Sequence, residues 1–412
     1  MRTWFPVLVA AALTVPAFVR RAAAISSMPA SDQDMVVFGA AVAGAAFLLA
    51  WAVGAVRRDT PSPLGAVLLV IALVLPESLV TLHLAAQAGR DPAYTAYAAA
   101  SLAGANRILV GLALPLALLA VLSRTRKGAL SLPTAVSVDL AFLGTVTFYS
   151  FVIYFKSSVS LLDSVFLIVV FGLYLWLAAR LPQEQRQAGS PAGAARPGTG
   201  RLRAVAVSLV LLIAALSLAA SAGPFAEALA TAGRASGDDL LLVQWVAPLV
   251  AQAPKIVMAG VLTWRGYAGE ALAVLLAARL VLGTLLTGAI PVALSLSAGA
   301  PRDLVLNSLQ REEFLLTCAQ TLFVVFLLAS LRLKAWEALV ILLLFITQIV
   351  VTDPQVRLIY AVIYVAGSLG LIVLSRERMR SVVNLIPVAT RFLQQSGGAA
   401  GGPASRTAPD GR

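Results

Sequence analysis

The chain has 412 residues, of which 60% are hydrophobic and 12% are charged, and its mean hydropathy is +0.90. A soluble globular protein carries about 25% charged residues, so this composition excludes a soluble protein or a large soluble domain. The formal net charge is +12, but the Lys and Arg residues stand in short clusters between apolar stretches, which indicates membrane topology and not nucleic-acid binding. The lipid bilayer is therefore the expected partner.

Apolar runs separated by charged residues predict about twelve transmembrane helices, because a bilayer is crossed by about 20 apolar residues. The runs are too long for barrel strands and lack their polar alternation, so the predicted fold class is an all-α polytopic membrane protein. The predicted spans cover residues 4–19, 36–56, 64–88, 95–122, 132–155, 158–179, 204–231, 240–264, 270–297, 313–331, 335–352 and 356–375.

The distribution of Lys and Arg orients these spans. With the N-terminus inside, most basic residues fall in cytoplasmic segments, which predicts a cell-membrane protein with both termini cytoplasmic. The run at 4–19 also resembles a signal-peptide core, but Arg20 and Arg21 directly after it favour a retained helix over a cleaved one. Both alternatives leave the second span running from outside to inside.

A segment rich in Gly, Pro, Ala, Gln and Arg at 181–203 has the composition of a flexible linker, and it divides the chain into halves. An amphipathic surface segment at 381–395 is an alternative to an ordinary solvated tail, which is preferred. The predicted organisation is an N-terminal helix and loop (1–35), a first repeat (36–180), the cytoplasmic linker (181–203), a second repeat (204–353), an extra helix (354–380) and a cytoplasmic tail (381–412).

The halves share a weak, ordered similarity. LVLPESLVTL in the first half corresponds to APLVAQAPKIVMAG in the second, so that Pro76-Glu77 aligns with Pro254-Lys255. In each following span an arginine and a glycine recur four positions apart, at Arg107 and Gly111 and at Arg279 and Gly283. Five spans per half is an odd number, which predicts that the second repeat is inverted in the membrane, as in many secondary transporters.

Glu77 lies near the middle of its predicted span, directly after a proline that removes a helical hydrogen bond. Placing an ionisable side chain at that depth costs at least about 2.5 kcal/mol, so a transport site is the preferred interpretation. The alternative is a structural ion pair of Glu77 with Arg107 or Lys255. His83, the single histidine, is six residues from Glu77 on a different face of the helix, which favours packing over proton relay.

These residues resemble the sodium/calcium exchanger superfamily of cation antiporters. Pro76 and Glu77 within LPESLVTL match the first motif of that family, and Gly104-Ala105-Asn106 matches the second motif with Ala in place of Ser. The resemblance implies two inverted repeats of five helices with broken helices over 36–352, plus one extra helix at each end. It also implies a central site for Na⁺, Ca²⁺ or H⁺.

Carried over by position, Glu77 and Asn106 would be the metal ligands of the first repeat, helped by the hydroxyls of Ser78 or Thr81. The second repeat departs from the family pattern. Lys255 stands where a second glutamate is expected, and Ala277-Ala278 stand where a polar residue is expected. Gln252 is the nearest remaining oxygen donor in that repeat.

The charges of this site argue against calcium. Ca²⁺ requires six to eight oxygen ligands, whereas Glu77 with Lys255 carries about zero charge and Arg107 and Arg279 add positive charge. A Glu–Lys pair still permits exchange of a monovalent cation, if Lys255 releases its proton as Na⁺ binds. The sequence therefore predicts a secondary-active cation antiporter that exchanges Na⁺ and H⁺ more readily than Ca²⁺, with no resident cofactor.

Two other classes are weighed against transport. A transport-inactive homologue, serving as a membrane scaffold or sensor locked by a Glu77–Lys255 bridge, is the main alternative. A membrane enzyme is not expected, because the sequence has no histidine cluster, paired-aspartate motif or Ser–His arrangement at a suitable depth. The single cysteine, Cys318, excludes an intramolecular disulfide and is expected to be a small buried hydrophobic residue.

Overall fold

The computed structural model of the chain describes residues 4–23, 32–59, 63–125, 128–179, 201–236, 240–350 and 353–391. Most of the predicted linker, 181–200, and the end of the predicted tail, 392–412, lie outside these residues. Within the described part, residues 201–203 begin a helix and residues 381–391 are largely helical. A helix at 381–391 is compatible with a solvated tail and with a segment on the membrane surface, so both stay predictions.

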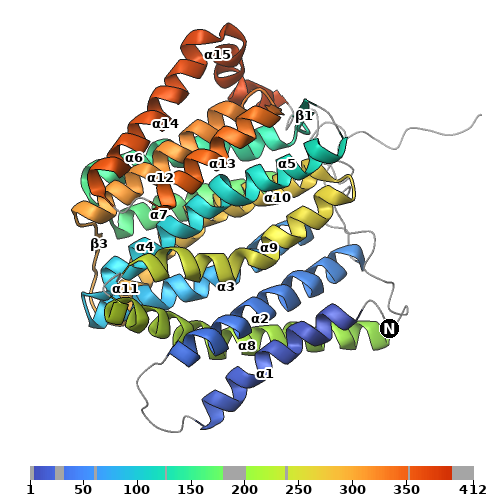
Figure 1. Ribbon diagram of the computed structural model, residues 1–412, viewed down its shortest axis with the longest axis vertical. Helices are drawn as coiled ribbons and strands as arrows, with labels where there is room; N and C mark the ends of the chain where they lie inside the picture. The colour runs from blue at the N-terminus through green and yellow to red at the C-terminus, as the bar shows by residue number, and fades with distance from the viewer. Residues whose placement is uncertain are drawn as a thin grey trace, which may run out of the picture.

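The described elements are almost entirely helical, which confirms the predicted all-α multi-pass fold (Figure 1). The first half contains α1 (Phe5–Ala23), α2 (Asp32–Asp59), α3 (Pro63–Arg90), α4 (Tyr94–Ile108), the π-helical η1 (Leu109–Ala113), α5 (Leu114–Thr125), α6 (Val136–Lys156) and α7 (Leu161–Ala179). The second half contains α8 (Arg201–Ser236), η4 (Leu242–Val246), α9 (Ala247–Trp264), α10 (Ala268–Val281), η5 (Leu282–Leu286), α11 (Thr287–Ala298), α12 (Ser308–Leu328), α13 (Ala335–Val350), α14 (Pro354–Leu374) and α15 (Arg376–Val383).

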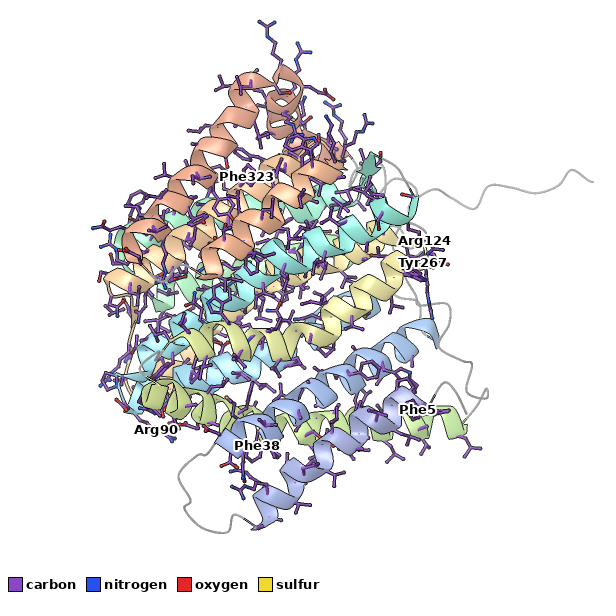
Figure 2. All side chains as sticks on the ribbon, in the orientation of Figure 1. Phe5, Phe38, Arg90, Arg124, Tyr267 and Phe323 are labelled. Atoms are coloured by element: carbon purple, nitrogen blue, oxygen red, sulfur yellow. The ribbon has the colours of Figure 1, made fainter. Side chains whose placement is uncertain are left out.

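Among the described residues, ten helical stretches are long and apolar enough to cross a membrane. The predicted spans at 313–331 and 335–352 are occupied by α12 and by the shorter apolar helix α13, and the exact number of spans stays a prediction. Arg90 and Arg124 lie at opposite ends of the bundle (Figure 2), so α4, η1 and α5 together run from one end to the other. Large apolar side chains such as Phe5 are exposed on the outer helices, as expected for contact with lipid.

The expected breaks at the two prolines are absent: α3 is helical through Pro76, and α9 is helical through Pro254. The π-helical segments lie elsewhere, within the following helices at η1 and η5 and directly before α9 at η4. A proline removes one hydrogen bond only, and neighbouring helices can hold the turns on either side. Single π turns inside helices are frequent at functional sites. Two of these segments, η1 and η5, lie one helix after the prolines, and η4 lies two turns ahead of Pro254 in the same span.

Helices of the two halves pack in matched pairs. α6 contacts α10 while α12 contacts α4, and α7 contacts α11 while α13 contacts α5. The short strands follow the same scheme: β1 (Ala129–Ser131) pairs with β4 (Arg332–Lys334), and β2 (Ser158–Val159) pairs with β3 (Leu304–Val305), both antiparallel. Two related halves would produce this exchange of partners, although the inverted repeat itself stays a prediction. α2 and α8 pack closely together beside α1, at one side of the bundle (Figure 1).

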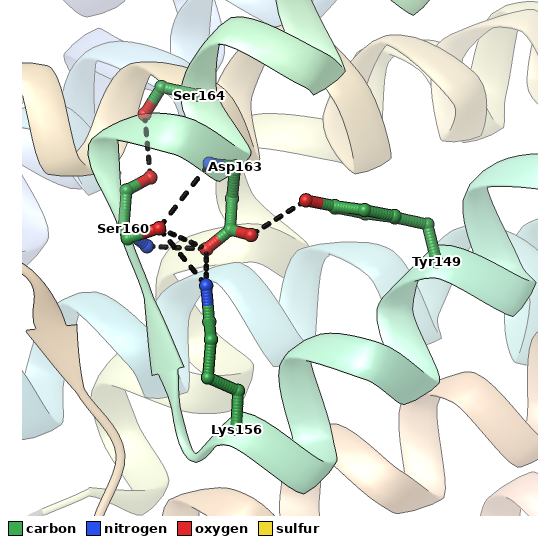
Figure 3. Close-up of polar contacts among 5 residues, drawn as sticks. All are labelled: Tyr149, Lys156, Ser160, Asp163 and Ser164. Carbon is green, nitrogen blue, oxygen red and sulfur yellow. Dashed lines mark hydrogen bonds and ion pairs between the residues drawn. The ribbon is translucent and has the colours of Figure 1, made fainter.

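The turn between α6 and α7 accounts for Asp163, one of the acidic residues near a span end (Figure 3). Its carboxylate accepts hydrogen bonds from the Ser160 backbone N–H at 2.6 Å and from the Tyr149 hydroxyl at 2.7 Å, and it forms an ion pair with Lys156. The Ser160 hydroxyl in turn accepts from the Asp163 N–H at 3.4 Å. This is a capping box at the start of α7, so Asp163 is assigned to helix capping.

Candidate functional site

Glu77 and Lys255 form an ion pair at the centre of the bundle, as one of the sequence-based interpretations expected. Glu77 lies halfway along α3 and Lys255 halfway along α9, and the Lys255 Nζ atom contacts Glu77 Oε1. Both residues are 2% exposed. Removing one charge of a buried ion pair leaves the other uncompensated, which is strongly unfavourable. If the Lys255 ammonium loses its proton, another cation has to bind Glu77 to compensate its carboxylate.

Three buried oxygen atoms of the predicted site residues have no hydrogen-bond donor among the described residues: Glu77 Oε2 on α3, Asn106 Oδ1 on α4 and Gln252 Oε1 on α9. The amide nitrogens of the two amides are engaged, because Asn106 Nδ2 donates to the Leu102 carbonyl at 2.8 Å and Gln252 Nε2 donates to the Ala105 carbonyl at 2.9 Å. Gln252 thus lies against the residue that precedes Asn106, and one helical turn from Lys255 on α9. Carboxylate and amide oxygens of this kind are typical cation ligands.

The two hydroxyl residues suggested as additional ligands already make hydrogen bonds. The Ser78 hydroxyl donates to the Val74 carbonyl at 2.7 Å, and the Thr81 hydroxyl is 2.7 Å from that of Ser101 on α4. Each hydroxyl oxygen retains a lone pair, but the observed bonds connect α3 with itself and with α4. Their assignment as ligands stays a prediction.

Arg107 does not pair with Glu77, contrary to the other sequence-based interpretation. It forms a buried ion pair with Glu313 of α12, whose second oxygen lies 3.0 Å from an Arg357 nitrogen of α14. Gln244 donates to the same carboxylate at 2.8 Å, and the Arg107 guanidinium lies 4.8 Å from the centre of the Trp245 ring. A charge network therefore joins α4, η4, α12 and α14 beside the central pair.

Glu313 was missed because the predicted span began at that residue. The signal that would have found it is the sequence Asn307-x-x-Gln310, which forms a capping box and starts α12 at Ser308. With the helix beginning there, Glu313 lies more than one turn inside it and is 5% exposed. Glu77 is therefore not the only buried acid among the helices.

Arg279 is a second buried cation that does not face Glu77. It is 5% exposed, and one terminal nitrogen donates to the Thr321 hydroxyl at 2.9 Å. The other guanidinium nitrogens have no hydrogen-bond partner among the described residues. The sequence analysis counted Arg107 and Arg279 with Lys255 as cations of the Glu77 site, but the three side chains have different partners: Lys255 pairs with Glu77, Arg107 with Glu313, and Arg279 bonds to Thr321.

The net charge of these groups remains positive after pairing. Glu77 and Lys255 cancel, Glu313 balances one of its two arginines, and Arg279 has no acidic partner among the described residues. The excess charge of Arg279 and of the Glu313 network disfavours a divalent cation nearby, because Coulomb repulsion is weakly screened in a protein interior. The described residues contain no group of three acidic, histidine or cysteine side chains suited to a metal ion.

His83 belongs to another cluster, between α3 and α8. Its Nε2 lies 3.0 Å from Glu227 Oε1, and Glu227 also accepts from Gln87 at 2.7 Å and from the Tyr94 hydroxyl at 2.5 Å. A side chain at Gly223 would approach the His83 ring to 2.9 Å, so this glycine makes room for the contact. The His83–Glu227 contact joins α3 to α8, and the preference for packing over proton relay stays a prediction. Cys318 is a free buried cysteine.

Solved structures with the same architecture are found, although no family model and no curated protein sequence matches the chain. A crystal structure of an H⁺/Ca²⁺ exchanger, CAX, has a TM-score of 0.88 and 28% identity, over 96% of this chain and 99% of that one. The structure of native YfkE has a TM-score of 0.61 and 12% identity, covering 83% of this chain and 98% of that chain. The sodium–calcium exchanger NCX_Mj, soaked with Na⁺ and Ca²⁺, has a TM-score of 0.52 and 15% identity, over 77% and 97%.

Proposed function

The chain belongs to the cation/Ca²⁺ antiporter superfamily, and we propose that it is a secondary-active antiporter that exchanges a monovalent cation, Na⁺, for H⁺. The observation that carries this proposal is the buried Glu77–Lys255 pair, together with the oxygens of Glu77, Asn106 and Gln252 that lack donors among the described residues. The fold is that of cation exchangers, one of which is described as an H⁺/Ca²⁺ exchanger. Lys255 stands where the family pattern has a second glutamate, and this replacement changes the charge of the site and therefore the cations that it can bind.

The ammonium of Lys255 occupies the place that a cation beside Glu77 would take. A cation can bind Glu77 only if this ammonium withdraws or loses its proton. In the resting pair, the charges of carboxylate and ammonium add to zero. With Na⁺ on the carboxylate and Lys255 as a neutral amine, they add to zero again, so one Na⁺ replaces one H⁺ without a change in buried charge.

A divalent ion would break this balance. Ca²⁺ on Glu77 with neutral Lys255 leaves one net positive charge in a bundle that already buries Arg279 without an acidic partner among the described residues and two arginines on one Glu313. Among the described residues of the predicted site, three oxygens lack donors, below the six to eight that Ca²⁺ takes. These two points support Na⁺/H⁺ exchange over transport of Ca²⁺.

Flux measurements on the full-length protein in liposomes test the proposal. An inward Na⁺ gradient should drive H⁺ out, so the internal pH should rise, and the rate should not depend on membrane potential because the exchange is electroneutral. Glu77→Gln should abolish the signal, whereas Asp303→Asn, which changes an exposed acid, should leave it unchanged. Absence of flux in the wild-type protein, or unchanged flux in Glu77→Gln, would contradict the proposal.

A transport-inactive scaffold or sensor is the second candidate, because Glu77 and Lys255 are buried and neutralise each other without a bound cation. Lys255→Glu combined with Ala278→Ser would return acidic and polar groups to the second repeat. An antiporter should respond with a changed ion preference. A scaffold should show no flux before or after the change.

A further inference from the structure

A cavity of about 440 Å³ lies at one end of the bundle, away from the central pair. It is bounded by the start of α6, the end of α12 and the segment that begins with α15. Its polar lining comes from Ser137, Ser330, Glu377, Arg380, Ser381 and Asn384. Because α6 begins, and α12 and α14 end, around this cavity, it lies where membrane-spanning helices meet the aqueous boundary.

Two hydroxyls of the cavity lining are already engaged, because Ser330 donates to the Arg332 carbonyl and Ser381 donates to the Glu377 carbonyl. Ser137 is fully buried, and its hydroxyl has no hydrogen-bond partner within the described structure. A buried hydroxyl without a partner costs free energy unless a ligand or water satisfies it. Arg380 and Asn384 are exposed and lie four residues apart, so they project from the same face of the terminal helical segment.

Charge identifies the kind of ligand. Arg378 is held by an ion pair with Glu337 of α13 and by a 3.4 Å hydrogen bond to the Leu327 carbonyl of α12. Of the remaining charges on α15, Arg380 and Glu377 both line the cavity and cancel, so the one positive charge left on the helix is that of Arg376, directly before the lining residue Glu377. A group carrying a single negative charge, such as a phosphodiester, would balance it.

The surroundings favour a lipid as the source of this phosphate. Leu331, Leu385 and Val388 line the cavity beside the polar groups. On the same terminal segment, Val383 and Ile386 are apolar side chains that are 69% and 61% exposed. Basic residues next to exposed apolar ones are typical of a segment that lies in a membrane interface.

We propose that this cavity binds the phosphodiester headgroup of an anionic phospholipid, with Arg380, Asn384 and Ser137 as donors and the apolar wall facing the glycerol and acyl chains. The bound lipid would hold α15 against the ends of α6 and α12. This site is independent of the proposed ion exchange, because none of its residues touches Glu77 or Lys255 in the described structure.

Lipid binding to the delipidated, full-length protein in detergent tests the proposal. Phosphatidylglycerol should raise the melting temperature and remain bound in native mass spectrometry, whereas phosphatidylcholine and inorganic phosphate at equal concentration should do neither. Arg380→Gln should weaken phosphatidylglycerol binding about tenfold, since a charge-assisted hydrogen bond is lost. Ser137→Ala should weaken it about fivefold, and Glu377→Gln should strengthen it.

Arg265→Gln is the matched control, because Arg265 is an exposed arginine at the end of α9 that does not line the cavity. It should bind phosphatidylglycerol like the wild type. Wild-type affinity in both Arg380→Gln and Ser137→Ala would overturn the proposal. So would stabilisation by inorganic phosphate that is lost in the same variants, because the ligand would then be a free anion. If Arg380→Gln fails to fold, Ser137→Ala removes only one hydroxyl and still decides the question.

Discussion

Lys255 contacts Glu77 halfway along both of their helices, and these residues come from the two halves of the chain. The exchange of helix partners between the halves brings α9 against α3. In a site with two glutamates a bound cation would hold the halves together. Here an ammonium that belongs to the protein contacts Glu77, so we expect the same pair to affect the stability of the bundle and, under the proposed function, its ion selectivity.

The pair should behave as a unit in stability measurements. Glu77→Gln alone is expected to lower the free energy of unfolding by about 3 to 5 kcal/mol, because it leaves Lys255 buried without a counter-charge. Glu77→Gln combined with Lys255→Met should recover most of that loss, since apolar replacement of a buried pair is often neutral. Thermal unfolding in detergent measures both. Additive losses in the double variant would show that the two residues are not energetically coupled.

Reversing the charge of Lys255 should change ion selectivity. Lys255→Glu places two carboxylates in contact and supplies the negative charge that a divalent cation requires. We expect Ca²⁺ binding to appear by isothermal titration calorimetry, at least about tenfold tighter than in the wild type. Lys334→Glu, at an exposed position in β4, provides the control for a change in overall charge. Equal Ca²⁺ affinity in the two variants would place the cation elsewhere.

Glu313 should be a major determinant of stability. Its carboxylate pairs with both Arg107 and Arg357, so Glu313→Gln leaves two buried guanidinium groups without an acid. The expected loss is about 3 to 5 kcal/mol, as for other broken buried pairs, and thermal unfolding should detect it. Asp303→Asn, an exposed acid in the preceding loop, should change the melting temperature little. A wild-type melting temperature for Glu313→Gln would mean that the network contributes nothing to the fold.

The sequence predicted the helices and the central pair but not the partners of the arginines. Hydropathy locates spans because each needs about 20 apolar residues, and the internal similarity aligned Glu77 with Lys255. The partner of Arg107 is Glu313, which is 206 residues later in the sequence. Which residue of α12 meets Arg107 depends on how that helix is rotated against α4. The π turns were also missed: the prolines mark α3 and α9, whereas η1 and η5 occur in the helices that follow.

Gly104 should tolerate no side chain, because α4 and η4 approach closely there. A Cβ atom at this position would lie 1.7 Å from the backbone carbonyl oxygen of Gln244, so the two helices would have to separate. Gly104→Ala should therefore disturb Asn106 and the Gln244–Glu313 contact, lower the melting temperature, and reduce any ion flux. Gly260→Ala is the matched control on α9, since a Cβ atom there meets nothing within 4 Å. It should stabilise its helix by about 0.5 to 1 kcal/mol, and equal melting temperatures for the two variants would contradict the close approach of α4 and η4.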